Sequence, residues 1–244
     1  MTMLSVNVNK IALLRNSRGR DFPNVVAFAK KFIALGAQGI TVHPRQDERH
    51  ITRQDAYDLA ELLVDYPDVE FNIEGYPSED FLQLVEACKP DQCTLVPDAV
   101  DQLTSDHGWD VAWHSELLAM VAARLKKSGI RVAAFLDPDM EQVRRVAQTG
   151  VDRIELYTEE YASAFGTRKQ AAVLAKYADA AAEAQRLELE VNAGHDLDSH
   201  NLATFLTIPG ILEVSIGHVL TVECLEQGMP AVMAKYLDIC QASA

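Results

Sequence analysis

One short pattern recurs along this chain and constrains its fold more than any other feature. A helical segment ends at a glycine, and a run of apolar or β-branched residues follows and ends in polar residues. Such a glycine is typical of the point where a helix stops and the chain turns into a strand. The pattern occurs in LGAQGITVH, KSGIRVAAFLD, TGVDRIELY and PGILEVSIGH, with the glycines Gly36, Gly129, Gly150 and Gly210.

Four more segments have the strand and its polar end without this glycine, so the sequence predicts eight strands. These segments are Met3 to Val8, PDVEFNIEG, KPDQCTLVP and LELEVNAGH. The predicted strand ends are Asn7, His43, Glu74, Pro97, Asp137, Tyr157, His195 and His218. Helical patterns separate the strands, for example over Arg53 to Tyr66, Ser78 to Cys88, Val111 to Lys127, Glu141 to Gln148 and Arg168 to Arg186.

Eight βα units in 244 residues predict a protein of the α/β class, a TIM (β/α)8 barrel that forms one domain over residues 1–244. A doubly wound open sheet is the competing interpretation, but no GxGxxG follows the first strand. Another helix is expected to begin at Asp21-Phe22-Pro23, with Asp21 as the cap and Pro23 in the first turn, and to run to Gly36.

The charge balance excludes some partners and indicates another. The formal net charge of −14 argues against nucleic acid. The first fifty residues nevertheless hold eight Lys or Arg against three Asp or Glu, which indicates a small anionic ligand bound near this part of the chain. No segment resembles a signal peptide or a membrane span, and the four cysteines lack the spacing of a zinc or redox motif. We therefore expect a cytoplasmic protein with no membrane partner.

Titratable residues gather at the predicted strand ends. His43, His195 and His218 fall at such ends, and His50 lies in the polar loop after His43. Glu74 also ends a strand, where burial could turn its carboxylate into a base. Because the carboxyl ends of barrel strands form one rim, these groups are expected to converge there. Ordinary salt bridges on a barrel rim are the alternative interpretation.

Phosphate binding is predicted at the end of the eighth strand, in IGHVL. The backbone N–H groups of Gly217 and His218 would lie at the start of the last helix, and helix N-termini bind anions. Arg15, Arg18 and Arg45 could add charge-assisted hydrogen bonds. The segment from Pro97 to Gly129 is longer than the others, and its loop could be a lid or a cover on the barrel flank.

Three other functions fit parts of the sequence. His43, Glu74, His195 and His218 are possible zinc or iron ligands, as in a metal-dependent hydrolase or lyase, but HxH and HExxH are absent. Lys10 is the one lysine close to a strand end, so a Schiff-base aldolase would depend on it alone. A regulatory barrel that binds sugar phosphates without turnover is the third possibility.

The order of several motifs resembles one enzyme family. VNVNKIALLRNSRG, GITVHPRQDERHI, FNIE, LVP with Thr104 beyond it, VNAGHD and IGH span nearly the whole chain, and together they resemble the pyridoxine 5′-phosphate synthases of bacterial vitamin B6 synthesis. The resemblance implies a TIM barrel with extra helices, a homo-oligomer that is typically an octamer, and no metal or organic cofactor. It also implies a transferase that condenses 1-deoxy-D-xylulose 5-phosphate with 3-amino-2-oxopropyl phosphate.

The same resemblance implies a role for each matching residue. His43 and Glu74 would accept protons, and His195 would donate one. The deoxyxylulose phosphate would be bound by Arg45, His50 and Thr104. The aminoketone phosphate would be held by Asn7, Arg18, Gly217 and His218, and by Asp196 through its backbone, where the family has a glycine. Asn9 and Lys10 would also lie at the sugar phosphate, although they replace the Asp-His pair that follows the first strand in the family.

Overall fold

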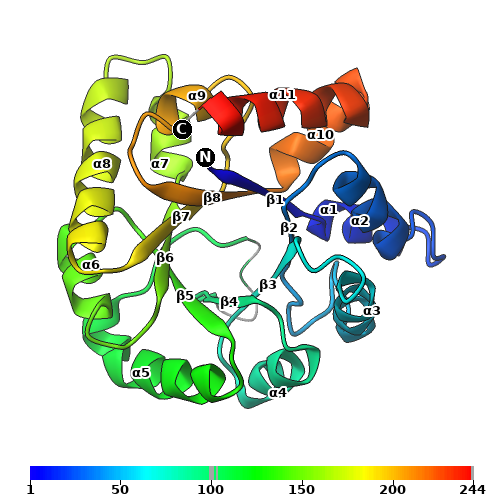
Figure 1. The fold of residues 1–244 in the computed structure, drawn as a ribbon, viewed down its shortest axis with the longest axis horizontal. Helices are drawn as coiled ribbons and strands as arrows, with labels where there is room; N and C mark the ends of the chain where they lie inside the picture. The colour runs from blue at the N-terminus through cyan, green and yellow to red at the C-terminus, as the bar shows by residue number, and fades with distance from the viewer. Residues whose placement is uncertain (99–101, 103, 243–244) are drawn as a thin grey trace.

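The computed structural model describes residues 1–98, 102 and 104–242. Eight parallel strands close into a barrel in chain order, and helices surround it (Figure 1). The strands are β1 (Met3–Asn7), β2 (Gly39–Val42), β3 (Glu70–Gly75), β4 (Gln92–Leu95), β5 (Arg131–Leu136), β6 (Arg153–Tyr157), β7 (Glu190–Gly194) and β8 (Ile211–Ile216). The predicted TIM barrel is therefore confirmed.

The helices lie outside the barrel, and several are additional to one helix per strand. They are α1 (Asn9–Asn16), α2 (Val25–Ala34), α3 (Arg53–Leu63), α4 (Glu79–Cys88), α5 (Val111–Lys127), α6 (Met140–Val146), α7 (Glu159–Ala164), α8 (Gln170–Arg186), α9 (Leu202–Phe205), α10 (His218–Gln227) and α11 (Met229–Ala242). Across the part of the chain that the structure describes, none of them combines the length and the apolar character that a membrane crossing requires.

The four glycines of the recurring pattern lie at helix-to-strand turns, as predicted. Gly36, Gly129, Gly150 and Gly210 have φ angles of +101°, +75°, +80° and +77°. A side chain is strained in this left-handed region, and glycine is not. The recurring glycine therefore marks each helix-to-strand turn because the backbone there has a positive φ.

Two boundary predictions are wrong. The helix expected to begin at Asp21 begins four residues later as α2, because the side chain of Asn24 caps it and accepts from the Ala27 N–H at 2.7 Å. Asp21 instead accepts a hydrogen bond from the Asn24 amide. The helix that follows β8, α10, is not the last one, because α11 comes after it.

The strands have one apolar and one polar face. Residues such as Leu4, Val6 and Ile40 join the hydrophobic core between the barrel and its helices. Their neighbours in the strands point into the barrel and are polar: the Ser5 and Thr41 hydroxyls lie 2.7 Å apart, and the Thr94 hydroxyl donates to Asn72 at 3.1 Å. TIM barrels more often fill this space with branched apolar side chains, so a polar interior is a feature of this chain.

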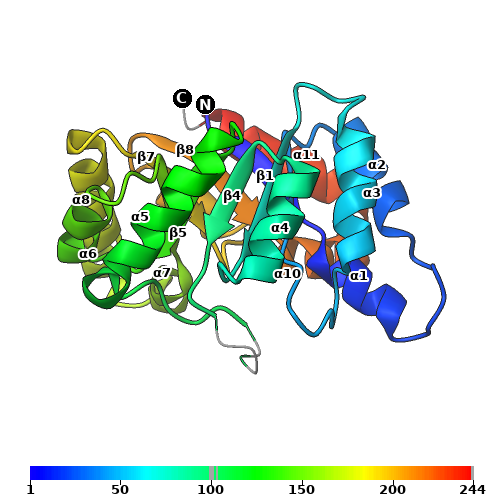
Figure 2. The ribbon, with the colours of Figure 1, turned by 90° about the horizontal axis from the view of Figure 1, so that it is seen from below.

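The carboxyl ends of the strands form one end of the barrel. In the side view, α1 and α10 lie near this end, and both chain termini lie at the opposite end (Figure 2). Part of the long loop that follows β4, residues 99–101 and 103, lies outside the described residues. The remaining loops at this end carry the predicted site.

Candidate active site

His43 and Glu74 lie beside each other at the barrel rim. His43 follows the last residue of β2, and Glu74 is the fifth residue of β3, the neighbouring strand. Nδ1 of His43 lies 3.8 Å from Oε2 of Glu74. The His43 N–H donates to Oδ1 of Asn9 at 2.9 Å, which fixes the β2 exit against the β1 exit.

The His43 side chain is buried and that of Glu74 is 13% exposed, and each group is disfavoured in its charged form. Burial lowers the pKa of His43 well below its usual value, and Arg45 and His50 lower it further. Burial also raises the pKa of Glu74 well above its usual value, assisted by the nearby carboxylates of Glu155 and Asp98. A neutral imidazole can accept a proton, and a carboxylate with a raised pKa is a strong base once ionised.

A third carboxyl group, Glu155, belongs to the same cluster and was not predicted from the sequence. Burial raises its pKa to about 8, and Glu213 contributes to this rise. Its Oε1 lies where a side chain at Gly194 would have to stand, since a Cβ there would be 2.3 Å away. Gly194 therefore lets this carboxyl group approach the strand end that precedes His195. The signal in the sequence was a single charged residue within the apolar strand IELY.

His195 follows β7 and has a left-handed φ of +85°. Its Nε2 lies 3.4 Å from the Thr104 hydroxyl, and its Nδ1 lies 3.3 Å from the Asp196 carboxylate. The Tyr157 ring packs edge-on against the imidazole at 5.1 Å between centroids. His195 also contributes to the lowered pKa of His43, so the two imidazoles are close enough to interact across the rim.

Arg45 and His50 lie in the loop after β2. Arg45 donates to the Asp98 carboxylate at 2.7 Å and to the Gln102 carbonyl at 3.3 Å, which connects this loop to the one after β4. Nδ1 of His50 accepts from the Ile51 N–H at 2.9 Å, so the proton of the neutral ring is on Nε2. Burial, then Arg45 and Lys10, lowers the pKa of His50 to about 4.

The exits of β1 and β8 meet at a second place on the rim. A Cβ on Gly217 would lie 3.0 Å from the Asn7 Cβ, so a glycine is needed for this close approach. His218 begins α10, and its charge contributes, after the hydrogen bond from His195, to the lowered pKa of Asp196. The start of α10 thus lies against Asn7 and near Asp196.

Three basic residues near the start of the chain, Lys10, Arg15 and Arg18, differ in their distance from the rim and in their partners. Lys10 lies in the first turn of α1, near enough to His50 to lower its pKa. Arg15, proposed above as a possible phosphate ligand, instead forms an ion pair with Asp55 through both terminal nitrogens. Arg18 is exposed beyond the end of α1, where its backbone N–H donates to the Arg15 carbonyl at 3.2 Å.

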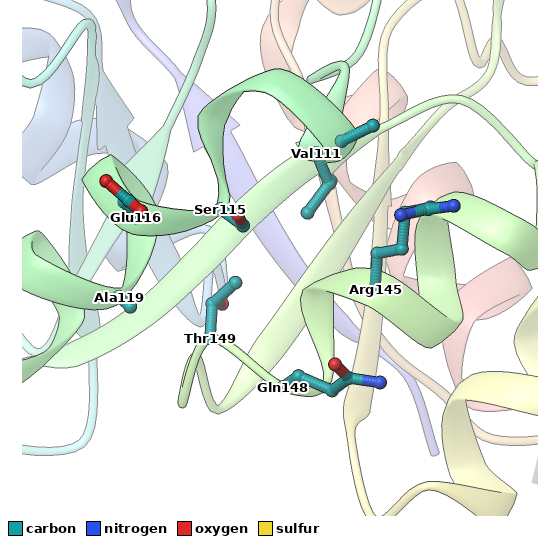
Figure 3. A pocket seen from close by; sticks show the side chains of 8 residues that line it. Val111, Ser115, Glu116, Ala119, Arg145, Gln148 and Thr149 are labelled. Atoms are coloured by element: carbon teal, nitrogen blue, oxygen red, sulfur yellow. The ribbon is translucent and has the colours of Figure 1, made fainter.

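Two hollows lie on the outside of the protein, and Arg15 is the one residue proposed above for the site that lines either of them. One, of about 330 Å³, lies between α5 and α6 and is lined by Ser115, Glu116, Arg145 and neighbouring residues (Figure 3). The other, of about 390 Å³, lies between the end of α1 and the start of α3. Among the residues that the structure describes, no three His, Cys, Asp or Glu side chains are grouped as metal ligands.

Comparison of the sequence with known proteins identifies one family. The model of the pyridoxal phosphate biosynthesis protein PdxJ matches residues 4–242. The chain belongs to the PdxJ family. The pyridoxine 5′-phosphate synthase of Cytophaga hutchinsonii is 50% identical over 238 residues, which cover 97% of this chain and 98% of that protein. The synthase of a Chelativorans species is 48% identical over 244 residues, which cover 98% of each chain. The resemblance inferred from the motifs is therefore confirmed.

Solved structures support the fold of this PdxJ family member. The 3-hexulose-6-phosphate synthase of Salmonella typhimurium has a TM-score of 0.69 at 15% identity over the whole of both chains. The tryptophan synthase α-subunit of Pyrococcus furiosus has a TM-score of 0.64 at 14% identity, covering 98% of this chain and 96% of that one. At such low identity these likenesses concern the barrel alone.

Proposed function

We propose that this chain condenses 1-deoxy-D-xylulose 5-phosphate with 3-amino-2-oxopropyl phosphate to give pyridoxine 5′-phosphate, inorganic phosphate and water. Membership of the PdxJ family supports the reaction. The observation that carries it at the level of the site is the pair of buried groups 3.8 Å apart, His43 and Glu74, with opposite pKa displacements.

Proton transfer is the main demand of this reaction. Imine formation, phosphate elimination, carbon–carbon closure and aromatisation each move a proton, and one positioned acid or base typically contributes ~10²–10⁴-fold. We assign proton acceptance to His43 and Glu74 and proton donation to His195. The neutral state of His43 and the raised pKa of Glu74 support the first assignment.

Two phosphorylated substrates require two anion sites. We assign the sugar phosphate to Arg45, His50 and Thr104, with Asn9 and Lys10 beside them. Arg45 donates one hydrogen bond to Asp98 and one to Gln102. Its guanidinium group has five N–H donors, so others can bind a phosphate. We assign the aminoketone phosphate to Asn7, Asp196, Gly217 and His218, where the N-terminus of the ten-residue helix α10 supports anion binding. Arg18 belongs to this second set by family resemblance alone.

Turnover with defined substrates tests the proposal. Purified protein mixed with both substrates in the presence of a chelator should release one phosphate for each pyridoxine phosphate, followed by phosphate assay and by ultraviolet absorbance. Each substrate alone should give neither product. Absence of both products at high protein concentration would refute the synthase. Activity that appears only after zinc or iron is restored would instead favour the metal-dependent alternative.

We also propose that the chain acts as a cytoplasmic homo-oligomer, with an octamer expected from the family. Apolar side chains on two helices that pack together support an association surface: Leu13 and Leu14 on α1, and Val222 and Leu225 on α10, are all at least one-third exposed. Light scattering coupled to gel filtration measures the mass. A monomer at micromolar concentration would refute this part of the proposal.

A further inference from the structure

Two consecutive residues after β7 have left-handed backbones without being glycine. The φ angle of His195 is +85° and that of Asp196 is +56°. This conformation costs roughly 1–2 kcal/mol for each L-residue, because Cβ crowds the following carbonyl oxygen. Strain of this kind persists only where surrounding groups hold the backbone in place. The question is therefore which groups hold this turn.

Side chains from two other elements hold its carbonyl groups. The Thr158 hydroxyl lies within hydrogen-bond reach of the His195 carbonyl and 2.7 Å from the Gly194 carbonyl, so its one proton is shared between them. The Asn201 amide donates to the Asp196 carbonyl at 3.1 Å. Three successive carbonyl groups, from residue 194 to residue 196, are thus held from outside the turn.

Both of these side chains stand at helix starts but do not cap them. Thr158 precedes α7 and Asn201 precedes α9, yet neither makes a side-chain cap hydrogen bond. Threonine and asparagine at this position normally accept from an N–H of the first helical turn, which is worth about 1 kcal/mol. Both residues are almost completely buried. Their side-chain donor groups bond to the carbonyl groups of the His195 turn, and no side-chain oxygen of either residue caps its own helix.

We propose that Thr158 and Asn201 are positioning residues that hold the imidazole of His195 in its reacting place. This inference rests on the proposed role of His195 as proton donor. Two aromatic rings already pack against the imidazole. The centroid of Tyr157, which is edge-on, lies 5.1 Å from that of the imidazole, and the centroid of Phe135 lies 6.3 Å from it. The hydrogen bonds from Thr158 and Asn201 to the three carbonyl groups fix the backbone that carries the ring. A displacement of about 1 Å in a reacting group can lower the rate about 10²-fold.

Isosteric variants test the proposal. Thr158→Val removes the donor and preserves the shape, and Thr158→Ser preserves the donor. We expect kcat to fall about 10- to 100-fold in the valine variant, with much smaller changes in KM for either substrate, and serine to restore kcat to within about 3-fold of the wild type. Asn201→Asp keeps the side-chain oxygen that accepts from the Asp198 N–H and removes the donor to the Asp196 carbonyl. We expect the same fall in kcat, with a much smaller change in KM.

Two controls separate positioning from general stability and from the proposed function. Asn24→Ala removes a cap that serves its own helix, so it should lower stability by about 1 kcal/mol and leave kcat unchanged. Wild-type kcat in both Thr158→Val and Asn201→Asp, beside an inactive His195→Asn, would overturn the positioning role alone. Wild-type activity in His195→Asn would instead overturn the role of His195 in the proposed function.

Discussion

The two ends of the barrel interior treat buried charge in opposite ways. At the amino end of the strands, Arg153 donates to Glu190 at 2.6 Å and to Gln92 at 3.0 Å, and it lies 3.5 Å from Glu213. Arg131 donates to Gln92 and forms an ion pair with Glu70. Acids and bases alternate here, so most of the charged groups have a partner, although burial still raises the pKa of Glu213 to about 7.

At the carboxyl end, the buried acids are close to one another and to few cations. Burial raises the pKa of both Glu74 and Glu155, Glu155 raises that of Glu74 further, and His43 stays neutral. Groups arranged in this way reduce stability, and pKa values displaced in this way are typical of catalytic sites. The comparison teaches that one end of the same interior is built to hold the barrel together, and the other to do acid–base chemistry.

The largest effect should come from removing a base at the carboxyl end. Glu74→Gln keeps the shape of the side chain, and we expect kcat to fall by ~10²–10⁴-fold because a general base is lost. The melting temperature should stay the same or rise, since a buried acid is replaced by a neutral amide. Steady-state kinetics and calorimetry measure the two. A kcat within about tenfold of the wild type would remove Glu74 from the acid–base machinery.

At the amino end, a substitution should lower stability and leave kcat nearly unchanged. Arg153→Met leaves Glu213 buried without its cation, and breaking a buried pair in this way costs about 3–5 kcal/mol. Urea denaturation should show this loss, while kcat of the folded protein stays within a few-fold of the wild type. Arg186→Met is the matched control, because the Arg186 side chain is exposed and its pairing with Glu183 is a surface salt bridge, whose loss should change stability little. Equal losses in both variants would contradict the comparison.

The pH dependence of stability should distinguish the ends further. Glu155 holds its proton in the folded protein up to a pKa of about 8, whereas the unfolded chain loses it near the ordinary value of 4.5. Between these values the folded state binds more protons, so its contribution to stability is present at low pH and is lost as pH rises towards 8.

Glu155→Gln removes this titration and should therefore stabilise the protein at pH 8 by roughly 1–3 kcal/mol, since one pKa unit corresponds to about 1.4 kcal/mol. The gain should shrink towards pH 5. Chemical denaturation at both pH values measures it. A gain that is the same at pH 5 and pH 8 would show that Glu155 is not held protonated.

The sequence predicts the parts of this molecule that depend on local chemistry. Glycine turns follow from φ preferences, and barrel closure brings every strand end to one rim, so His43, Glu74 and His195 could be predicted to meet. Glu155 and Thr158 could not, because their importance arises from neighbours distant in the sequence. Nothing in the local sequence shows that Gly194 leaves room for a carboxyl group or that the Thr158 hydroxyl contacts His195.

Competition between similar signals explains the other errors. Asp21 and Asn24 are both good helix caps, and the choice between them depends on which N–H each side chain reaches in three dimensions. Arg15 looked available for phosphate because Asp55, forty residues away, is not visible as its partner in a single sequence. The first error is thus a choice between two local caps, and the second is a tertiary contact that overrides a correct local preference.

The smallest effect is expected in the neutral layer between the two ends. Ser5→Ala removes a hydroxyl 2.7 Å from that of Thr41, and Thr41 keeps the Asn72 amide within 3.4 Å as a donor. A neutral hydrogen bond is worth about 1 kcal/mol, so stability should fall by about that amount at every pH from 5 to 8, and kcat should not change. Denaturation and kinetics over this range check it. A loss that grows with pH would contradict this expectation, because neither of the two hydroxyl groups titrates in this range.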